Sequence, residues 1–379
     1  MTDPLRATLR EAKRIVVKVG SRSIVGASID EGARPGGGRF AQLAAQVVAL
    51  RSEERAVVLV SSGAVALGRG RLGFSAKPRA IAELQACAAV GQSLLMRGWE
   101  QALGAHSVAV AQMLLSHADL EDRERYLNAR AALGALLELS AVPVINENDT
   151  VAVDEIRFGD NDQLAAMVCT LAGADLLVLL TDVEGLLDGS GARVRSVDEL
   201  GSAQALVGSA PSGSSRTELG SGGMGSKLEA ARRAARRGVP VLIADARDPA
   251  VLTRALAGED VGTLVRPQGS RLASRKHWIA YTLRPRGDLI LDPGAVVAIR
   301  EGHRSLLPAG VVGVRGHFGP GDLVILRDTS LREVGRGLVR YGTEDAAKLA
   351  GAKTGDIGAR LGYHGGDEIV HRDDLVVSD

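Results

Sequence analysis

Short apolar runs alternate with helical patterns through the first two-thirds of the chain. The runs are nearly uncharged, and each has about the length of one buried strand. They fall at 14–19, 56–60, 107–113, 141–145, 174–180 and 239–244. Helical periodicity lies between several of them, over 39–50, 80–103 and about 120–139. Because uncharged strands joined by helices are buried on both faces, the pattern predicts a three-layer α/β/α domain with a mostly parallel sheet.

The pattern changes after residue 268. From residue 286 short strands follow one another closely, with glycine and proline turns between them, and only 343–352 reads as a helix. We therefore expect a first domain over 1–270, a linker over 271–285 and a small mainly-β domain over 286–379, whose core ends near residue 364.

Composition fits a globular cytoplasmic protein. Of the 379 residues, 45% are apolar, which is ample for a core, and the net charge of +1 argues against a protein that coats nucleic acid. No uncharged apolar run reaches the roughly 18 residues of a membrane span, and the first residues lack the apolar centre of a signal peptide. Cys87 and Cys169 stand in helical patterns, so we expect buried thiols in a reducing compartment.

Polar residues gather where the predicted strands end, which is where ligands of an open parallel sheet bind. Lys18 stands in the first strand, and it either reaches solvent from the strand end or directs its charge at phosphate oxygens. Ser62 and Gly63 follow the second strand, in a small-residue turn that offers backbone N–H groups to an anion. Thr181 and Asp182 follow the fifth strand, where they would contact a nucleotide or cap the next element.

Two loops are unusually rich in polar side chains: Asn-Glu-Asn-Asp-Thr at 146–150 and Gly-Asp-Asn-Asp-Gln at 159–163. Turn formation with N-capping by Asp160 or Asp162 would explain part of this density. The functional interpretation is a pocket for a small zwitterion. Carboxylates would bind its ammonium group, while asparagine side chains and backbone N–H groups would bind its carboxylates.

A glycine-rich loop, Gly-Ser-Gly-Gly-Met-Gly-Ser-Lys at 220–227, leads into a helical pattern. Such a loop can surround phosphates with backbone N–H groups, and Lys227 adds a full positive charge. Ser226 separates the last glycine from the lysine, so the loop does not end as a Walker A loop does. The Ser/Gly-rich stretch 208–223 also has the composition of a flexible linker, which is the alternative interpretation.

The candidate residues include two lysines but no convincing catalytic histidine or Ser-His-Asp arrangement. This combination suits phosphoryl transfer. Phosphoryl transfer depends mainly on positioning and on the stabilisation of negative charge. An acceptor carboxylate, with a pKa near ~4.3, is already ionised at neutral pH and needs no general base. Lys18 and Lys227, together with Mg²⁺, would supply the positive charge. The sequence therefore predicts a kinase that phosphorylates a carboxylate.

Motifs along nearly the whole chain resemble the amino acid kinase family, and within it the branch that phosphorylates glutamate. They read VVKVG, LVSSGAVALG, QMLLSHADLEDRERYLNAR, VPVINENDTVA, FGDNDQLAA, LLTDVEGL, GTLV and GGMGSK. The paired NEND and GDND motifs are the most specific of these. The last domain resembles a PUA domain.

The resemblance implies a role for each candidate residue. Charge stabilisation and catalysis would involve Lys18, Lys227, Asp160 and Asp162. Glutamate would be bound by Ser62, Gly63, Asn146, Asp149 and Asn161. ATP would be bound by Lys18, Thr181, Asp182, Ser221, Gly222, Gly223, Met224, Gly225, Ser226 and Lys227. Metal ligands are not identified.

The resemblance also implies an activity and its partners. ATP would phosphorylate the side-chain carboxylate of L-glutamate to L-glutamyl 5-phosphate, the first step toward proline, with Mg²⁺ as cofactor. Proline would be a feedback inhibitor, and the protein would be a homo-oligomer, dimeric or tetrameric, with no membrane partner.

Two alternatives remain. The substrate could be acetylglutamate, aspartate, carbamate or UMP, although the polar loops favour a free amino group. The PUA-like domain could bind RNA, but from residue 271 on the chain has 16 Lys and Arg against 14 Asp and Glu, a net charge of +2. That charge is small for strong binding to a phosphate backbone.

Three segments depart from the family pattern. Arg22 lies in a loop where small hydroxyl residues are usual, and we expect it to alter the approach to phosphate. Arg157 stands where related enzymes often have lysine, which keeps the charge but changes its geometry. The glycine-rich stretch 26–39 identifies no site.

Overall fold

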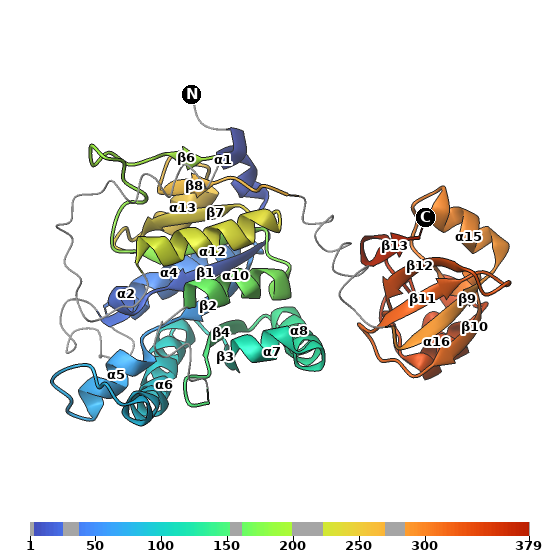
Figure 1. Cartoon of the computed structure of the whole chain (residues 1–379), viewed down its shortest axis with the longest axis horizontal. Coiled ribbons are helices and arrows are strands. Elements are labelled where there is room, and N and C mark those ends of the chain that lie inside the picture. Colours follow the sequence, from blue (N-terminus) through green and yellow to red (C-terminus); the bar gives the residue numbers. More distant parts are fainter. Residues whose placement is uncertain (1–3, 26–37, 152–160, 199–222, 270–284, 379) are drawn as a thin grey trace. The chain divides into compact units, whose positions relative to one another are not determined.

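The computed structural model describes residues 4–25, 38–151, 161–198, 223–269 and 285–378. The chain divides into two compact units, residues 1–269 and 270–379, and each is described by itself (Figure 1). The expected linker over 271–285 lies almost entirely outside the described residues, as does nearly all of the stretch 26–39.

The described residues of the first unit form an eight-stranded sheet in the order β3-β4-β2-β1-β5-β7-β8-β6. Neighbouring strands are parallel except for β7 and β8, which are antiparallel. This confirms the predicted mostly parallel sheet. The strands are β1 (Arg14–Val19), β2 (Ala56–Ser61), β3 (Val110–Leu115), β4 (Val142–Glu147), β5 (Leu176–Thr181), β6 (Ser196–Val197), β7 (Val241–Asp245) and β8 (Thr263–Val265). The sequence had not predicted the short strands β6 and β8.

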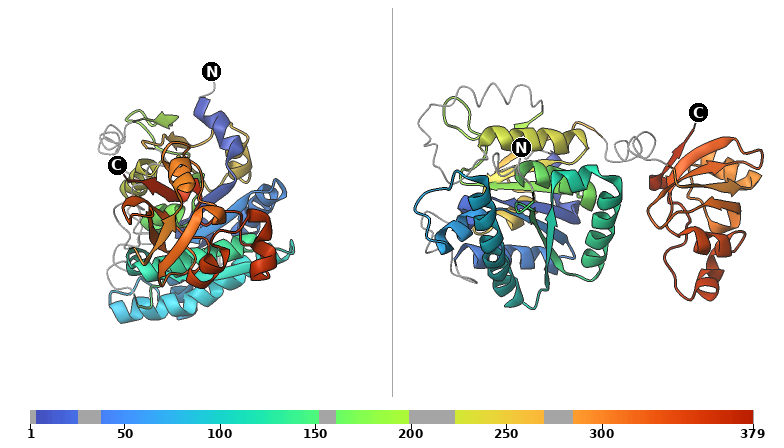
Figure 2. Two further views of the ribbon diagram at one scale, coloured as in Figure 1. Left: turned by 90° about the vertical axis from the view of Figure 1, so that its right-hand side faces the viewer. Right: turned by 60° about the horizontal axis from the view of Figure 1, so that its bottom comes forward.

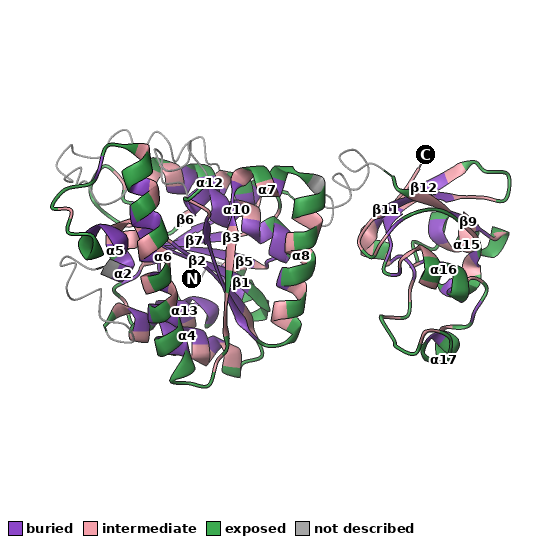
Figure 3. Ribbon diagram, turned by 90° about the horizontal axis from the view of Figure 1, so that it is seen from below, coloured by how far each residue is buried: buried purple, intermediate pink, exposed green. Residues whose placement is uncertain are grey.

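Helices cover both faces of this sheet, as the three-layer prediction requires (Figure 3). One apolar cluster joins the sheet to α4 (Arg39–Ser52), α6 (Ile81–Gly104) and α13 (Val251–Leu256). The other joins it to α8 (Arg123–Glu138), α10 (Asn161–Ala172) and α12 (Met224–Arg236). Helices α10 and α12 lie side by side on this second face (Figures 1 and 2).

The alternation of side chains along β1 decides which face receives Lys18. Ile15, Val17 and Val19 belong to the cluster under α4 and α6, while Val16 belongs to the cluster under α10 and α12. Successive side chains of a strand point to opposite faces, so Lys18 lies on the same face as Val16. The lysine is therefore directed toward α10 and α12.

The long helix expected over about 120–139 is two helices. Helix α7 (His117–Glu121) ends before Asp122, and Asp122 caps α8 by accepting a hydrogen bond from the backbone N–H of Arg125. The apolar periodicity alone did not reveal this break, because an aspartate is also tolerated inside an exposed helix. The capping preference of aspartate is the signal that could have revealed it.

Helices α5 (Ala64–Arg71) and α6 cross at two glycines. A Cβ at Gly68 would overlap the carbonyl group of Cys87, and a Cβ at Gly91 would overlap the carbonyl oxygen of Ala64. The absence of a side chain at both positions allows the two backbones to touch. This contact brings the middle of α6 next to the turn that follows β2.

The second unit contains a five-stranded sheet in the order β10-β9-β11-β12-β13. These strands are β9 (Gly287–Leu291), β10 (Val311–Gly316), β11 (Leu323–Arg327), β12 (Glu333–Leu338) and β13 (Leu375–Val377). The sheet bears out the mainly-β prediction for this unit. Its last strand, β13, pairs with β12 and lies beyond residue 364.

The expectation of a helix only within 343–352 was wrong. Besides α16 (Thr343–Leu349), the unit contains α15 (Pro293–Arg300) and α17 (Ile357–Leu361). Asp292 caps α15 by accepting a hydrogen bond from the Ala295 N–H at 2.7 Å, and Pro293 occupies the first turn. The Asp-Pro pair was the missed signal, since both residues favour a helix start.

None of the helices in the described parts of the chain is long and apolar enough to cross a membrane.

Candidate active site

Four adjacent strands bring their carboxyl ends together in the order β4-β2-β1-β5. Asn146 stands near the end of β4, Ser62 directly after β2, and Lys18 near the end of β1. Thr181 ends β5. The strand order therefore gathers the predicted strand-end residues along one edge of the sheet.

Lys18, Asp162 and Lys227 form a buried cluster from three elements. Lys18 Nζ lies 2.7 Å from Asp162 Oδ1, and Lys227 Nζ lies 3.1 Å from Asp162 Oδ2. The three residues are 5%, 1% and 6% exposed, in the order Lys18, Asp162 and Lys227. Each carboxylate oxygen thus receives one ammonium group, and the cluster keeps one net positive charge when all three are ionised.

Helix starts account for two members of this cluster. Asp162 lies in the first turn of α10, where the helix dipole favours negative charge. Lys227 lies in the first turn of α12, and the hydroxyl of the preceding Ser226 donates to Asp162 Oδ2 at 3.3 Å. Lys227 meets Asp162 because α12 runs beside α10.

Opposing effects set the ionisation of the cluster. Burial alone would raise the pKa of Asp162, but the two ammonium groups outweigh it and hold that pKa below its usual range. Burial lowers the pKa of Lys227, and the charge of Lys18 lowers it further, against the opposing effect of Asp162. Asp162 is therefore a carboxylate at neutral pH, and Lys227 is a lysine that releases its proton more readily than usual.

A second group of side chains lies beside the lysines. Asn161 Nδ2 donates to Ser62 Oγ at 2.8 Å and to Asn146 Oδ1 at 2.9 Å. Asn146 Nδ2 donates in turn to Gln92 Oε1 at 2.8 Å. The structure thus brings together three residues predicted to bind substrate and adds one, Gln92, that the sequence had not revealed.

A faint signal for Gln92 was present in the sequence. Gln85 and Gln92 stand seven residues apart in α6, so they lie on one side of the helix two turns apart. Gln85 Nε2 donates to the carbonyl oxygen of Thr150 at 3.2 Å. Both glutamines therefore face the polar segment that begins at Asn146.

Arg22 pairs with a residue that was predicted to contact the nucleotide. Arg22 Nη1 lies 2.9 Å from Asp182 Oδ2, and both side chains are about half exposed. Burial would raise the pKa of Asp182, but the hydrogen bond from Arg22 outweighs it and lowers that pKa. Thr181 Oγ1 also donates to Asp182 Oδ1, at 3.3 Å. The effect of Arg22 on phosphate stays a prediction.

The remaining candidates divide between described and undescribed residues. Gly63 has φ +117°, a left-handed conformation that favours glycine, and it begins the turn into α5. Asp149 is half-buried in the segment after β4. Gly223 precedes α12, and no described side chain caps that helix start. Met224 and Gly225 occupy the first turn. Four other residues that the sequence singled out lie outside the described residues: Arg157, Asp160, Ser221 and Gly222.

No group of three or more His, Cys, Asp or Glu side chains that could hold a metal lies in the described parts of the chain. Asp162, the carboxylate between the lysines, already meets an ammonium group on each oxygen. The described residues therefore offer no all-protein metal cage at this site.

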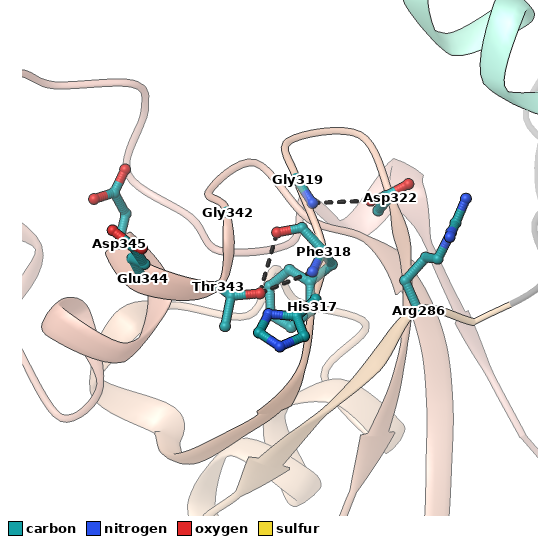
Figure 4. A pocket seen from close by; sticks show the side chains of 9 residues that line it. All are labelled: Arg286, His317, Phe318, Gly319, Asp322, Gly342, Thr343, Glu344 and Asp345. Carbon is teal, nitrogen blue, oxygen red and sulfur yellow. Dashed lines mark hydrogen bonds between the residues drawn. The ribbon is translucent and has the colours of Figure 1, made fainter.

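A separate pocket of about 520 Å³ lies within the second unit. Figure 4 shows Glu344 and Asp345 at one end of it and Arg286 at the other. His317 and Asp322 also line it. Three carboxylates against one arginine and one histidine make this lining unfavourable for a nucleic-acid phosphate.

The chain resembles known proteins over nearly its whole length. The sequence profile of the amino acid kinase family matches residues 13–245, and that of the PUA domain matches residues 287–360. Glutamate 5-kinase of Pseudomonas paraeruginosa strain PA7 is 48% identical over 98% of this chain and 100% of the relative. Glutamate 5-kinase of Stutzerimonas stutzeri strain A1501 is 46% identical over the same shares. Among solved structures, a carbamate kinase from Giardia aligns with a TM-score of 0.48 at 16% identity, covering 68% of this chain and 99% of that one.

Proposed function

Because the chain belongs to the glutamate 5-kinase branch of the amino acid kinase family, we propose that it transfers the terminal phosphoryl group of ATP to the side-chain carboxylate of L-glutamate. The product is L-glutamyl 5-phosphate, and the reaction is the first step of proline biosynthesis. The second domain is a PUA domain.

The observation that carries this function is the Lys18–Asp162–Lys227 cluster. A glutamate side chain is ionised at neutral pH, so the site needs no general base. It needs positive charge near the transferred group, whose oxygens are negative throughout the reaction. Lys18 and Lys227 supply that charge from β1 and α12, on opposite sides of Asp162. Asp162 balances part of it and holds both ammonium groups in place before substrates arrive.

Substrate and nucleotide bind on either side of this cluster in the proposal. Asn146, Asn161 and Ser62 are hydrogen-bonded to one another beside the lysines, which supports a glutamate site there. Gly63 and Asp149 complete this site. The nucleotide contacts Thr181 and Asp182 at the end of β5, and its phosphates meet the segment from Gly223 to Ser226 at the start of α12. Asp160, Ser221 and Gly222 keep their predicted roles as part of the proposal.

Magnesium enters the reaction as the Mg·ATP complex. Mg²⁺ is commonly held by one or two carboxylates together with substrate phosphates, and the lack of an all-protein cage among the described residues is compatible with that arrangement. When bound, the ion neutralises phosphate charge. Lys18 and Lys227 would supply the protein's own positive charge to the transferred phosphoryl group.

The family gives three further properties as proposals. The protein forms a homo-oligomer, proline inhibits it, and it works in the cytoplasm. RNA binding by the PUA domain is disfavoured by the net charge of +2 from residue 271 on and by the acidic lining of its pocket.

A substrate panel tests the proposed function. The purified protein is mixed with Mg·ATP and one acceptor at a time: glutamate, acetylglutamate, aspartate or carbamate. We expect ADP release to depend on glutamate and to be far slower with the other acceptors. Turnover of acetylglutamate or aspartate without turnover of glutamate would overturn the substrate assignment.

A further inference from the structure

A continuous chain of hydrogen bonds runs from α6 to the start of α10. Gln92 Oε1 accepts from Asn146 Nδ2 at 2.8 Å, and Asn146 Oδ1 accepts from Asn161 Nδ2 at 2.9 Å. Asn161 Nδ2 also donates to Ser62 Oγ at 2.8 Å. Gln92 is the outer end of this chain and has no role in the proposed reaction so far.

The direction of the chain determines what Asn161 offers to a ligand. A carboxamide has an acceptor at one end and donors at the other. Asn146 and Ser62 use both hydrogens of Asn161 Nδ2, which leaves Asn161 Oδ1 as the remaining polar atom. That oxygen is buried and has no hydrogen-bond partner among the described residues. A buried acceptor without a partner is unfavourable unless a ligand supplies a donor.

The three amides can reverse only together. If only the side-chain amide of Asn161 were flipped, its Oδ1 would face the Oδ1 of Asn146, and two hydrogen-bond acceptors would meet. Reversing Asn146 as well would bring its Oδ1 against the Oε1 of Gln92. The direction of the whole chain therefore depends on the group that Gln92 presents to Asn146. In this structure that group is Oε1, and Gln92 Nε2 is buried with no hydrogen-bond partner among the described residues.

Resting on the proposed function, we propose that Gln92 is a positioning residue for the α-ammonium group of glutamate. By accepting from Asn146, Gln92 keeps Asn161 Oδ1 as the acceptor that meets this group. An ammonium group is only a donor, so the reversed chain, with Asn161 Nδ2 toward the substrate, would set donor against donor. Gln92 thereby contributes to the preference for a free amine over a substrate without one.

The packing of α6 supports a positioning role. Gly91, the neighbour of Gln92, touches the Ala64 carbonyl group across the α5–α6 crossing. This contact leaves the backbone of Gln92 little freedom to shift. Gln85, two turns earlier, contacts the same polar segment through the Thr150 carbonyl oxygen but takes no part in the amide chain, which makes it a matched control.

The test compares Gln92→Met, Gln92→Glu and Gln85→Met in the full chain. Methionine keeps the length of the side chain and removes the acceptor, whereas glutamate can still accept from Asn146 Nδ2. The measurements are KM for glutamate, KM for ATP, and the inhibition constant of glutarate, which has both carboxylates but no amine.

Gln92→Met is expected to raise KM for glutamate about tenfold, a loss of about 1.4 kcal/mol, and to leave KM for ATP and the glutarate constant within about twofold. Gln92→Glu and Gln85→Met are expected to keep KM for glutamate within about threefold. Three results would overturn the proposal. In Gln92→Met, the binding of glutamate and of glutarate would weaken equally, or KM for glutamate would stay unchanged. In Gln85→Met, KM for glutamate would rise by the same tenfold factor.

Two further outcomes keep the test decisive. Loss of glutamate binding in Gln92→Glu overturns the proposal even when Gln92→Met does not fold. If the wild-type protein does not use glutamate, the proposed function itself is refuted. A change in KM that is confined to the Gln92 variants tests only the positioning role.

Discussion

Asp162 accepts an ammonium group on each of its oxygens, from Lys18 at 2.7 Å and from Lys227 at 3.1 Å. The position of Lys18 in an apolar strand and of Lys227 at the end of a glycine-rich loop predicted the two lysines as charge stabilisers, and the family resemblance implied a catalytic role for Asp162. Their contact through Asp162 was not predictable. It depends on the rotation of α10 about its axis and on the distance between α10 and α12, which apolar periodicity does not determine.

Lys227→Met tests charge stabilisation by the second lysine. The variant keeps the volume of the side chain but loses a positive charge in a buried site, so we expect kcat to fall by roughly 10²–10³, as for other preorganised donors to a transition state. KM for glutamate should change much less. Lys77→Met replaces an exposed lysine of the same unit and should leave kcat unchanged. A Lys227→Met enzyme with near-normal kcat would contradict this role.

The lowered pKa of Lys227 predicts a pH dependence. Lys227 must be protonated to act as a cation, and burial makes it lose its proton below the usual lysine pKa of ~10.4. The value of kcat/KM, which reports the ionisation of the free enzyme, should therefore fall on the alkaline side, starting below that value. In Lys227→Arg the guanidinium stays charged, so the activity that this variant retains should begin to decline only at a higher pH than that of the wild-type protein. An identical alkaline decline in both proteins would assign it to another group.

Among the helices and strands, sequence patterns located most elements of the first unit. The predicted strands at 14–19 and 56–60 differ from β1 and β2 by at most one residue. Patterns failed where a single polar residue decides the structure. Asp122 divides the helix expected over about 120–139, and Asp292 starts α15 inside a run that reads as a strand. A cap depends on one side chain, so a periodicity averaged over many residues does not detect it.

The α5–α6 crossing gives a prediction at the scale of helices. Gly91→Ala places a Cβ against the backbone of Ala64 and Gly68, where neither helix can move without losing its packing. We expect the free energy of unfolding to fall by about 1–3 kcal/mol, the usual range for overpacking. Denaturant titration of Gly104→Ala, at the end of the same helix where nothing lies within 4 Å of an added Cβ, should show no such loss. Equal stability of the two variants would contradict the crossing.

At the scale of the whole molecule, the two units have separate apolar cores. Among the described residues, no core cluster contains side chains of both units. The sequence predicted this organisation from the change of pattern after residue 268, because a change from helix-and-strand alternation to closely spaced strands requires a different core. It could not predict what the PUA domain does, since neither its charge nor its pocket points to one partner.

Separate cores predict that the first unit works alone. A variant ending at residue 285 should fold cooperatively and keep kcat with glutamate within about threefold, because every described residue proposed to act in the reaction lies before residue 245. Loss of glutamate-dependent activity in a folded truncated protein would show that the PUA domain contributes to the site.

The position of phosphorylation tests the central claim most directly. The protein is incubated with Mg·ATP, glutamate and hydroxylamine, and mass spectrometry with fragmentation identifies the trapped hydroxamate. The account predicts glutamate hydroxamate on the side-chain carboxyl group, formed only with ATP and formed far more slowly by Lys227→Met. A hydroxamate on the α-carboxyl group, or ATP cleavage without any hydroxamate, would contradict it.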